Sequence, residues 1–408
     1  MWASYGATPV PKKTIQSVDV SGKRVLTRVD FNVPTDDGQI TDDRRIREAL
    51  PTINSIISRG GRAILMSHMG RPEGQGYEAE YSLAIAAKKL SELLGRPVAF
   101  PSQDCTDATA AAAVNSMQNG DVLLLENLRF HKGEKKGDST FAAKLASYGD
   151  IYVNDAFGTA HRPDASMVAV PNAMKGKPRV AGFLLEKELK FLSETLAAPA
   201  KPFVVVLGGA KVSDKMGAID HLLPKASAII VGGAMAYTFL AALGKKVGTS
   251  KVETDRIPDA KRTIDLAAKL KAELHLPVDH TCSTQFAENS GDIEVFDEEI
   301  KDGFMGLDIG PKTQTKYAMI LRKAKTIVWN GPMGVFEFRP FSQGTQQVAK
   351  AIADATTNGA ISIVGGGDSA AAVEKFGFSA KMTHVSTGGG ASLEMLEGKK
   401  FESVDLLD

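Results

Sequence analysis

The sequence predicts an α/β protein made of two doubly wound parallel-sheet (Rossmann-like) domains joined by a hinge helix. With 408 residues, the chain is longer than one hydrophobic core usually organises, so two domains are the default. Short apolar runs rich in β-branched residues recur without polar alternation, which is typical of strands buried on both faces of a parallel sheet. Helix-like segments separate these runs, as a doubly wound fold requires.

The first predicted domain covers residues 1–180 and alternates strand-like with helix-like segments. Ser82–Leu94 illustrates the helices, because its leucines and alanines form a stripe along one helical face. The predicted strands of this domain are Arg24–Phe31, Arg62–Ser67, Pro97–Phe100, Asp121–Leu125 and Ile151–Asn154.

The second predicted domain covers residues 201–392 and repeats this plan. Between the two, residues 181–200 are expected to form a connecting helix and hinge, because leucines from Leu185 to Leu196 recur on one helical face and prolines follow. Residues 393–408 form a C-terminal tail. The predicted strands of the second domain are Phe203–Leu207, Ala228–Val231, Glu273–Pro277, Thr326–Trp329, Ala360–Val364 and Thr383–Ser386.

Composition narrows the classes of function. The formal net charge is +1, from 49 basic and 48 acidic residues, which provides no general attraction to nucleic acid or to an anionic membrane. Cys105 and Cys282 form neither a metal-binding spacing nor a disulfide framework, as expected in a reducing cytoplasm. Met1–Lys13 lacks the apolar core of a signal peptide, and no apolar run approaches the roughly 18 residues that a membrane span needs.

Polar side chains follow the predicted strands of the first domain. They occur in Arg28–Pro34, Ser67–Pro72, Leu125–His131 and Val153–Arg162. Because the carboxyl ends of parallel strands share one edge of the sheet, we expect them to gather the side chains of Arg45, His68, Arg71, Arg129 and Arg162. Arginine binds carboxylate and phosphate groups in bidentate fashion, so the sequence predicts a site for a small, highly anionic ligand.

Glycines take the same positions in the second domain. They lie in Gly208–Lys215, Gly232–Met235, Trp329–Gly334, Gly365–Asp368 and Gly388–Gly390. In the last case, Met382–Leu396 reads as a strand, a tight turn and a helix, whose free N–H groups could bind phosphate without a side chain. Any one of these turns could equally serve only to pack a helix on a sheet, but their number favours a nucleotide site.

Three charged residues accompany these glycine turns. Asp368 could hold Mg²⁺, which needs few carboxylates and takes its other ligands from water and phosphate, or it could be a helix N-cap. Lys211 and Lys215 are four residues apart, so they would project on one side if a helix starts there.

Sequence motifs argue against two other enzyme classes. The chain has no P-loop signature. Gly365–Ala370 fits the loose G-x-G-x-x-A fingerprint of dinucleotide sites, but the next strand ends at Ser386 and Thr387 without the acid that would hold a ribose. The alternatives left open are an NAD-dependent oxidoreductase, a catalytically silent nucleotide-binding protein and, least favoured by the charge, a nucleic-acid binder.

Taken together, the motifs closely resemble those of phosphoglycerate kinases, in order and over nearly the whole chain. The matching segments are Val29–Pro34, Ser67–Pro72, Leu125–His131, Asn154–Arg162, Gly208–Lys211, Trp329–Pro332, Gly365–Asp368 and His384–Gly390. The resemblance implies reversible phosphoryl transfer from 1,3-bisphosphoglycerate to Mg·ADP, giving 3-phosphoglycerate and ATP in glycolysis and gluconeogenesis. It also implies a cytoplasmic monomer that binds Mg²⁺, and a C-terminal tail that packs back on the first domain.

The resemblance assigns residues to each ligand. 3-Phosphoglycerate would be held in the first domain by Asp30, Phe31, Asn32, Arg45, His68, Arg71, Arg129 and Arg162. The nucleotide would be held in the second by Lys211, Lys215, Gly232, Gly233, Gly306, Asn330, Pro332, Glu337, Gly366, Gly367, Asp368 and Ser369, with Asp368 on the metal. The departures are mild: Ser369 stands where threonine is expected, and Met1–Pro9 differs from the usual start of the family and is assigned no role.

The chemistry of this reaction agrees with the residues present. In the ATP-consuming direction the nucleophile is a carboxylate that is already ionised at neutral pH, so no general base is required. Catalysis then depends on positioning and on cations around the moving group. We expect Arg45, Lys215 and the N–H groups of Gly388, Gly389 and Gly390 to stabilise the transferring phosphoryl group, once the two domains close.

Overall fold

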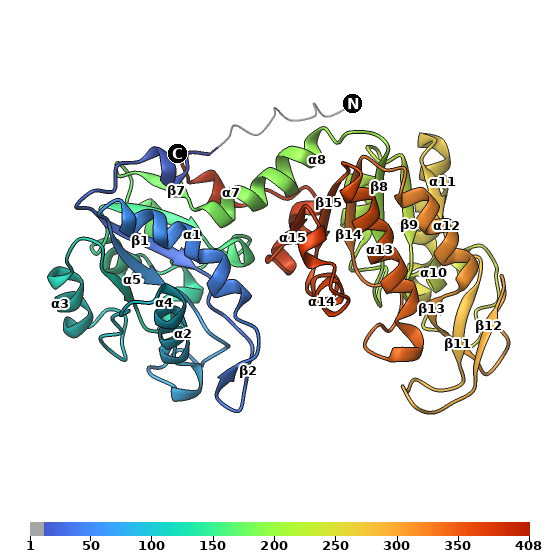
Figure 1. Cartoon of the computed structure of the whole chain (residues 1–408), viewed down its shortest axis with the longest axis horizontal. Helices are drawn as coiled ribbons and strands as arrows, with labels where there is room; N and C mark the ends of the chain where they lie inside the picture. The colour runs from blue at the N-terminus through green and yellow to red at the C-terminus, as the bar shows by residue number, and fades with distance from the viewer. Residues whose placement is uncertain (1–11) are drawn as a thin grey trace. The chain divides into compact units, whose positions relative to one another are not determined.

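A computed structural model describes residues 12–408 and divides them into two compact units (Figure 1). Unit 1 consists of the chain up to Lys190 together with Lys400–Asp408, and unit 2 consists of Phe191–Lys399. Met1–Pro9, to which the sequence assigned no role, lies outside the described residues. Each unit has a parallel sheet with helices packed against it, which confirms the predicted fold class.

Unit 1 is built on a five-stranded parallel sheet in the order β5-β4-β1-β6-β7. The chain starts in the middle of this sheet and moves first to one edge and then to the other, so the direction of winding reverses between β1 and β6. Val29 at the end of β1 pairs with Asp155 at the end of β6, which brings the two strand ends side by side. A ligand site is expected at such a reversal. The strands are β1 (Arg24–Val29), β4 (Arg62–Met66), β5 (Val122–Leu124), β6 (Ile151–Asp155) and β7 (Arg179–Ala181).

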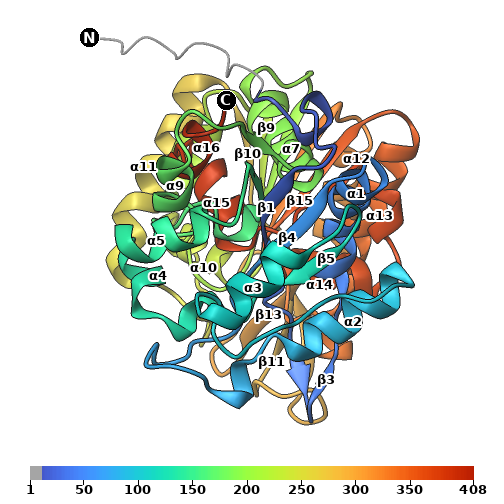
Figure 2. The ribbon, with the colours of Figure 1, turned by 90° about the vertical axis from the view of Figure 1, so that its left-hand side faces the viewer.

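Helices cover both faces of this sheet. Figure 2 shows α1 and α2 on one side of the strands and α4 and α5 on the other. Alternate strand residues such as Val25 and Leu65 pack with Ile53 of α1 and Leu90 of α2 in one core. The helices are α1 (Arg44–Ser58), α2 (Ala84–Leu94), α3 (Ala108–Ser116), α4 (Lys132–Lys136), α5 (Ser139–Ala146), α6 (Ala169–Ala173), α7 (Phe183–Leu189) and α16 (Glu402–Asp405).

Unit 2 repeats the arrangement with a six-stranded parallel sheet in the order β10-β9-β8-β14-β15-β16. Winding reverses between β8 and β14, where Leu207 pairs with Asn330. A separate antiparallel sheet has the order β12-β11-β13. The strands are β8 (Phe203–Leu207), β9 (Ala228–Val231), β10 (Glu273–His275), β11 (His280–Ser283), β12 (Ile293–Phe296), β13 (Met305–Ile309), β14 (Thr326–Asn330), β15 (Ile361–Gly365) and β16 (His384–Val385).

The main core of unit 2 lies between one face of its parallel sheet and a layer of helices. Trp329 of β14 is fully buried there and packs with Tyr317 of α12 and Ile352 of α13. The helices of this unit are α8 (Thr195–Ala197), α9 (Met216–Leu222), α10 (Met235–Ala242), α11 (Ile257–Leu270), α12 (Pro311–Leu321), α13 (Gln343–Thr357), α14 (Gly367–Lys375) and α15 (Gly390–Leu396). Within residues 12–408, no helix combines the length and the apolar character that crossing a membrane demands.

The C-terminal segment of unit 1 is tied to distant parts of that unit. The Asp408 N–H donates to the carbonyl of Arg179 at 2.8 Å, and the Asp408 carbonyl accepts the N–H of Lys13 at 2.8 Å. The Ser403 hydroxyl donates to the carbonyl of Ala160 at 2.6 Å. A short hairpin of β2 (Thr35–Asp36) and β3 (Gln39–Ile40) completes the unit.

Three details differ from the sequence prediction. Pro97–Phe100 is not a strand, because only Ala99 forms a bridge, with Leu123. Strand β7 and the antiparallel sheet were not predicted, and Ala181 belongs to β7 rather than to a helix. The connecting helix is not uniform: α7 passes into a π-helical turn at Lys190–Glu194 before α8, and the boundary between the units falls in that turn. Such turns widen a helix locally and often mark functional positions.

Helix α7 begins on a buried carboxyl group at the end of β6. The Asp155 Oδ1 atom accepts the N–H groups of Leu184 at 2.9 Å and Leu185 at 3.2 Å, so Asp155 caps the helix. Burial raises the pKa of Asp155 to about 7, although hydrogen bonds from Thr52 and from the two amides oppose the change. Asp155 is therefore expected to bind a proton in the folded protein at mildly acidic pH.

We expect the Asp155→Asn substitution to change how stability depends on pH. In the unfolded chain an aspartate has a pKa of about 3.9, so unfolding releases a proton from Asp155 between pH values of about 4 and about 7. Across that window the contribution of Asp155 to the free energy of unfolding falls as pH rises, by at most about 1.4 kcal/mol per pH unit. Asparagine removes this contribution while its carbonyl can still accept both amides.

Urea unfolding at about pH 5 and about pH 8 measures the effect. As pH rises, the unfolding free energy of wild type should fall relative to that of Asp155→Asn. Asp302→Asn, at an exposed position, is the control and should follow wild type. Parallel pH profiles for Asp155→Asn and wild type would contradict the proposed titration.

Candidate functional site

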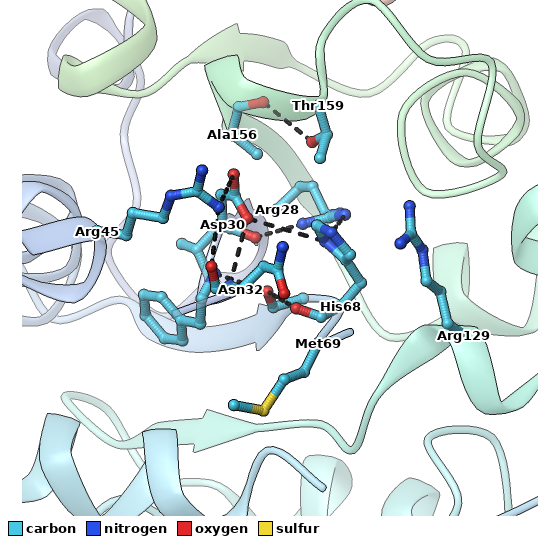
Figure 3. A network of polar contacts seen from close by, with 12 residues as sticks. Arg28, Asp30, Asn32, Arg45, His68, Met69, Arg129, Ala156 and Thr159 are labelled. Atoms are coloured by element: carbon cyan, nitrogen blue, oxygen red, sulfur yellow. Dashed lines mark hydrogen bonds and ion pairs between the residues drawn. The ribbon is translucent and has the colours of Figure 1, made fainter. Parts of the chain in front are cut away.

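The first part of the site lies where β1 ends in unit 1 (Figure 3). Arg45, in the first turn of α1, donates from Nη1 to the carbonyl of Asn32 at 2.9 Å, and the same nitrogen lies 3.2 Å from Asp30 Oδ2. The Asn32 side chain in turn accepts the N–H of Gly70 at 2.9 Å. The loop after β1, the loop after β4 and the start of α1 are thereby held together.

His68 lies at the centre of this arrangement. It is 1% exposed, and its Nδ1 lies 3.2 Å from Arg28 Nη2 and 3.8 Å from Asp30 Oδ1. Burial holds the pKa of His68 well below its usual value. The positive charges that lower it further belong to Arg28, Arg129, Arg162 and Arg45. His68 is therefore neutral at physiological pH, in a strongly cationic surrounding that favours an anionic ligand.

Arg129 is positioned by a short 3-10 turn, Leu128–Phe130, that follows β5. Asn127 anchors this turn, because its side chain accepts the N–H of Arg129 at 3.0 Å and donates to the carbonyl of Met69 at 2.8 Å. Arg129 is 6% exposed, and its guanidinium group donates to the Gly70 carbonyl at 3.0 Å and to Asp164 at 3.5 Å. Within the described residues its Nε has no hydrogen-bond partner, which leaves one donor for a ligand.

The predicted gathering of arginines is therefore present for three of its members. Arg45, Arg129 and Arg162 all act electrostatically on His68. Arg162 is half-buried and its Nε lies 3.5 Å from His161 Nε2. Arg71 follows Gly70 in the loop after β4 and is exposed, so its participation stays a prediction.

Behind this cluster lies a buried network that sequence reasoning missed. Arg28 of β1 is fully buried and donates from Nε to the Ser166 hydroxyl at 2.8 Å. That hydroxyl donates to Glu134 at 2.6 Å, and Glu134 is also fully buried. An arginine inside an apolar strand was the available signal, because a buried charge must find buried partners. The network fixes Arg28, which contacts His68 and adds its positive charge to the site.

In unit 2, Lys215 links the segment between β8 and α9 to the end of β14. It precedes α9, and its Nζ donates to the Asn330 side chain at the end of β14. Burial lowers the pKa of Lys215, while the charges of Asp214, Asp368 and Glu397 act in the opposite direction. Lys215, Asn330 and Asp368 are thus neighbours at the edge where winding reverses. Ser369 adds to this edge, because its hydroxyl accepts the N–H of Gly331 at 2.6 Å.

Two sequence hypotheses about this edge are corrected. Asp368 is not an N-cap, since α14 starts at Gly367 with Gly366 as its cap, and Asp368 lies exposed in the first turn. Lys211 and Lys215 do not share a helical face, because α9 begins only at Met216. Lys211 is exposed in a loop whose Val212 and Ser213 amides are held by Glu253 at 2.5 Å and 3.1 Å.

The predicted glycines fall into two groups. At Gly208, Gly232, Gly233 and Gly306 an added Cβ would collide with neighbouring backbone or side chains, so these glycines permit close packing of the strand ends. Around Gly367 and Gly389 there is open space, and Gly389 has a φ of +51° just before α15. We expect the open space at these glycines to let a ligand approach their backbone N–H groups.

The remaining predicted residues of unit 2 follow β14 or precede α15, and they differ in exposure. Pro332 is buried, and its carbonyl accepts the N–H of Gly209 at 2.9 Å. Glu337 is exposed, and its carbonyl accepts Lys375 Nζ at 3.2 Å. In the last glycine turn, the Gly388 N–H donates to the Ser386 hydroxyl at 3.1 Å. The binding roles of all these residues stay predictions.

Comparisons with known proteins agree with this geometry. A family model described as "Phosphoglycerate kinase" matches residues 15–399. A phosphoglycerate kinase from Rhodopirellula baltica is 57% identical over 400 residues, covering 97% of this chain and 99% of that protein. The structure of phosphoglycerate kinase from Coxiella burnetii is similar with a TM-score of 0.87 at 40% identity, covering 97% of this chain and 98% of the other. That of phosphoglycerate kinase from Pyrococcus horikoshii has a TM-score of 0.83 at 34% identity, with the same coverage.

Proposed function

Because the chain belongs to the phosphoglycerate kinase family, we propose that it transfers a phosphoryl group reversibly between 1,3-bisphosphoglycerate and Mg·ADP, giving 3-phosphoglycerate and ATP. The observation that carries this proposal is the cluster of arginines around a buried, neutral His68 at the strand ends of unit 1. A ligand with both a carboxylate and a phosphate matches such a cluster. The named relatives do not favour an NAD-dependent or a silent nucleotide-binding alternative.

On this proposal, unit 1 binds and orients the acid substrate. Arg129 and Arg162 provide guanidinium forks for its phosphate, and Asp30 and Asn32 hold Arg45 in place next to the acyl end. His68 offers a neutral imidazole that can form a hydrogen bond with the substrate. Since the attacking carboxylate is already ionised, none of these residues has to remove a proton.

Unit 2 would bind the nucleotide. Lys215 supplies a cation beside Asn330, and the open glycines at the starts of α14 and α15 would present main-chain N–H groups to the phosphates. The residues present fit Mg²⁺, because Asp368 is a single exposed carboxylate in the first turn of α14 and can be one of its few protein ligands. When bound, Mg²⁺ neutralises charge on the phosphate oxygens.

Transfer without hydrolysis requires the two ligands to meet in the absence of water. We therefore include closure of the two domains over the hinge helix in this proposal, with residues 1–180 binding 3-phosphoglycerate and 201–392 binding the nucleotide. We also propose that the enzyme is cytoplasmic and monomeric, and that it binds neither nucleic acid nor membrane. Light scattering at assay concentration would reveal any dimer.

A coupled assay of ATP consumption tests the function. We expect turnover only when 3-phosphoglycerate and Mg²⁺ are both present, with return of activity when Mg²⁺ is restored after chelation. ATP hydrolysis that is independent of 3-phosphoglycerate, or turnover unaffected by chelation, would contradict the proposal.

The Arg71→Ala substitution tests which unit binds which substrate. Loss of one charged hydrogen-bond donor to an anion costs roughly 1.5–3 kcal/mol, so KM for 3-phosphoglycerate should rise about 10- to 100-fold with little change in KM for ATP. Arg96→Ala, at an exposed position of the same unit, should leave both constants unchanged. A rise in KM for ATP alone would reverse the assignment of ligands to units.

A further inference from the structure

A second cluster of side chains in unit 1 has the donor set of a transition-metal site. Asp104 and Cys105 lie in the loop before α3, and His131 follows the 3-10 turn that carries Arg129. One ligand atom from each of the three residues lies within 4.8 Å of the other two. His131 Nε2 and Asp104 Oδ1 are only 2.9 Å apart. This trio has no part in the proposed phosphoryl transfer.

The spacing of these donors is close to what a tetrahedral zinc ion requires. With bonds of about 2.0–2.3 Å, neighbouring ligands of zinc are about 3.3–3.8 Å apart. The three donors would therefore need to move by only about 1 Å to enclose an ion. Three protein ligands leave a fourth position for water, and Asp104 and His131 are partly exposed, with 43% and 29% of their side chains accessible.

The side chains around the trio hold it in place. Asp104 Oδ1 also accepts the Thr106 N–H at 2.7 Å and the Thr106 hydroxyl at 3.0 Å, which fixes the carboxylate. The His131 ring stacks on Phe141 of α5, with centroids 5.0 Å apart. Supporting contacts of this kind orient metal ligands and are a regular part of such sites.

The surroundings also favour a cation. An adjoining hollow of about 310 Å³ is lined by the carboxylates of Asp104, Asp107 and Asp138 and by a single lysine, Lys144. Carboxylates around the hollow attract a dication, which can displace the proton of the Cys105 thiol.

We propose that Asp104, Cys105 and His131 bind one zinc ion in unit 1, separate from the position proposed for Mg²⁺ at Asp368 in unit 2. A thiolate, an imidazole and a carboxylate suit Zn²⁺, whereas Mg²⁺ prefers oxygen ligands in an octahedral arrangement. Binding replaces the S–H bond of Cys105 with a sulfur–zinc bond and releases the proton to solvent. The ion would clamp the loop before α3 to the turn that positions Arg129.

Cobalt provides a direct probe, because Co²⁺ bound to a thiolate has a charge-transfer absorption band in the near ultraviolet. After dialysis against a chelator, the full-length protein should develop this band on addition of one equivalent of Co²⁺ in excess Mg²⁺. Zn²⁺ should then abolish the band. In parallel, one equivalent of Zn²⁺ should raise the melting temperature, because ligands that bind only the folded state stabilise it.

Four variants make the test specific. Cys105→Ser and His131→Asn should lose the band, and zinc affinity should fall by more than about 100-fold. Thr106→Val, which removes one hydrogen bond to Asp104, should weaken affinity about 10-fold. Cys282→Ser is the matched control, since Cys282 is the other buried cysteine of the chain and lies in unit 2, and it should keep the band.

The absence of a band in the wild type would overturn the proposal and leave the trio as an ordinary hydrogen-bonded pair next to an inert thiol. A band that survives in Cys105→Ser, or that disappears in Cys282→Ser, would also overturn it. Should Cys105→Ser fail to fold, His131→Asn decides the question, because His131 is partly exposed and its replacement creates no buried cavity.

Discussion

The Arg45→Ala substitution is expected to lower kcat on the order of 10³-fold, as for other arginines that stabilise a transferring phosphoryl group. Within residues 12–408, the hydrogen bond and the ion pair of Arg45 both involve Nη1, which Asn32 and Asp30 hold in place. Nη2 and Nε are therefore available to donate to the reaction centre. The positive charge of Arg45 matters most in the transition state, where negative charge is spread over the transferring group. Its loss should therefore lower kcat more than substrate affinity.

Arg47→Ala is the matched control. Arg47 lies on the same helix, is exposed and pairs with Asp43 at 2.7 Å and 2.9 Å. Its loss should leave kcat within about twofold, because exposed ion pairs contribute little. Steady-state kinetics with saturating substrates, together with circular dichroism to verify folding, provides the measurement. A decrease of less than tenfold in correctly folded Arg45→Ala would remove Arg45 from the catalytic role.

The parallel sheets could be predicted from the sequence because their strands have a simple pattern. Phe203–Leu207 and Ala228–Val231 occur in the structure with the predicted bounds, since each is an uninterrupted run of apolar residues between polar or glycine-containing segments. Once the strands are parallel, their carboxyl ends must share an edge. The approach of Arg45 and Arg129 to His68 follows from that geometry and needs no knowledge of individual contacts.

The antiparallel sheet escaped prediction because its pattern is weak. β12 is largely exposed, so its residues carry no buried face that would mark a strand. β11 contains His280 and Cys282, and it pairs on both sides with the two strands that follow it in the chain, β12 and β13. Pairing of this kind depends on tertiary contacts that local composition does not reveal.

Glycines posed a different problem, because a glycine that packs and one that faces a ligand look the same in a sequence. Gly208 and Gly331 touch each other's backbone, which only a residue without Cβ permits. Gly367 and Gly389 face open space instead. The buried partners of Arg28 were equally hidden, since Ser166 and Glu134 lie more than a hundred residues away in the chain.

The Lys215→Met substitution should lower kcat by about 10²- to 10³-fold, the usual loss when one preorganised group that stabilises developing charge is removed. Methionine keeps most of the length and apolar volume of the side chain but removes the cation beside Asn330 and Asp368. Burial removes water from the ammonium group of Lys215, which lowers its pKa and strengthens its interaction with a phosphoryl oxygen. Calorimetry should show that ADP affinity changes much less than kcat.

Lys225→Met separates this role from the general loss of a half-buried charge near α9. Lys225 lies just beyond the other end of that helix, burial also lowers its pKa, and its Nζ contacts the Leu196 carbonyl at 3.3 Å and His221 at 3.2 Å. Its loss can affect stability but should leave kcat within about twofold, because no reacting group is near it. If both variants lost activity equally, the effect would come from disturbance of α9. If Lys215→Met retained more than a tenth of wild-type kcat, charge at that position would not be needed for transfer.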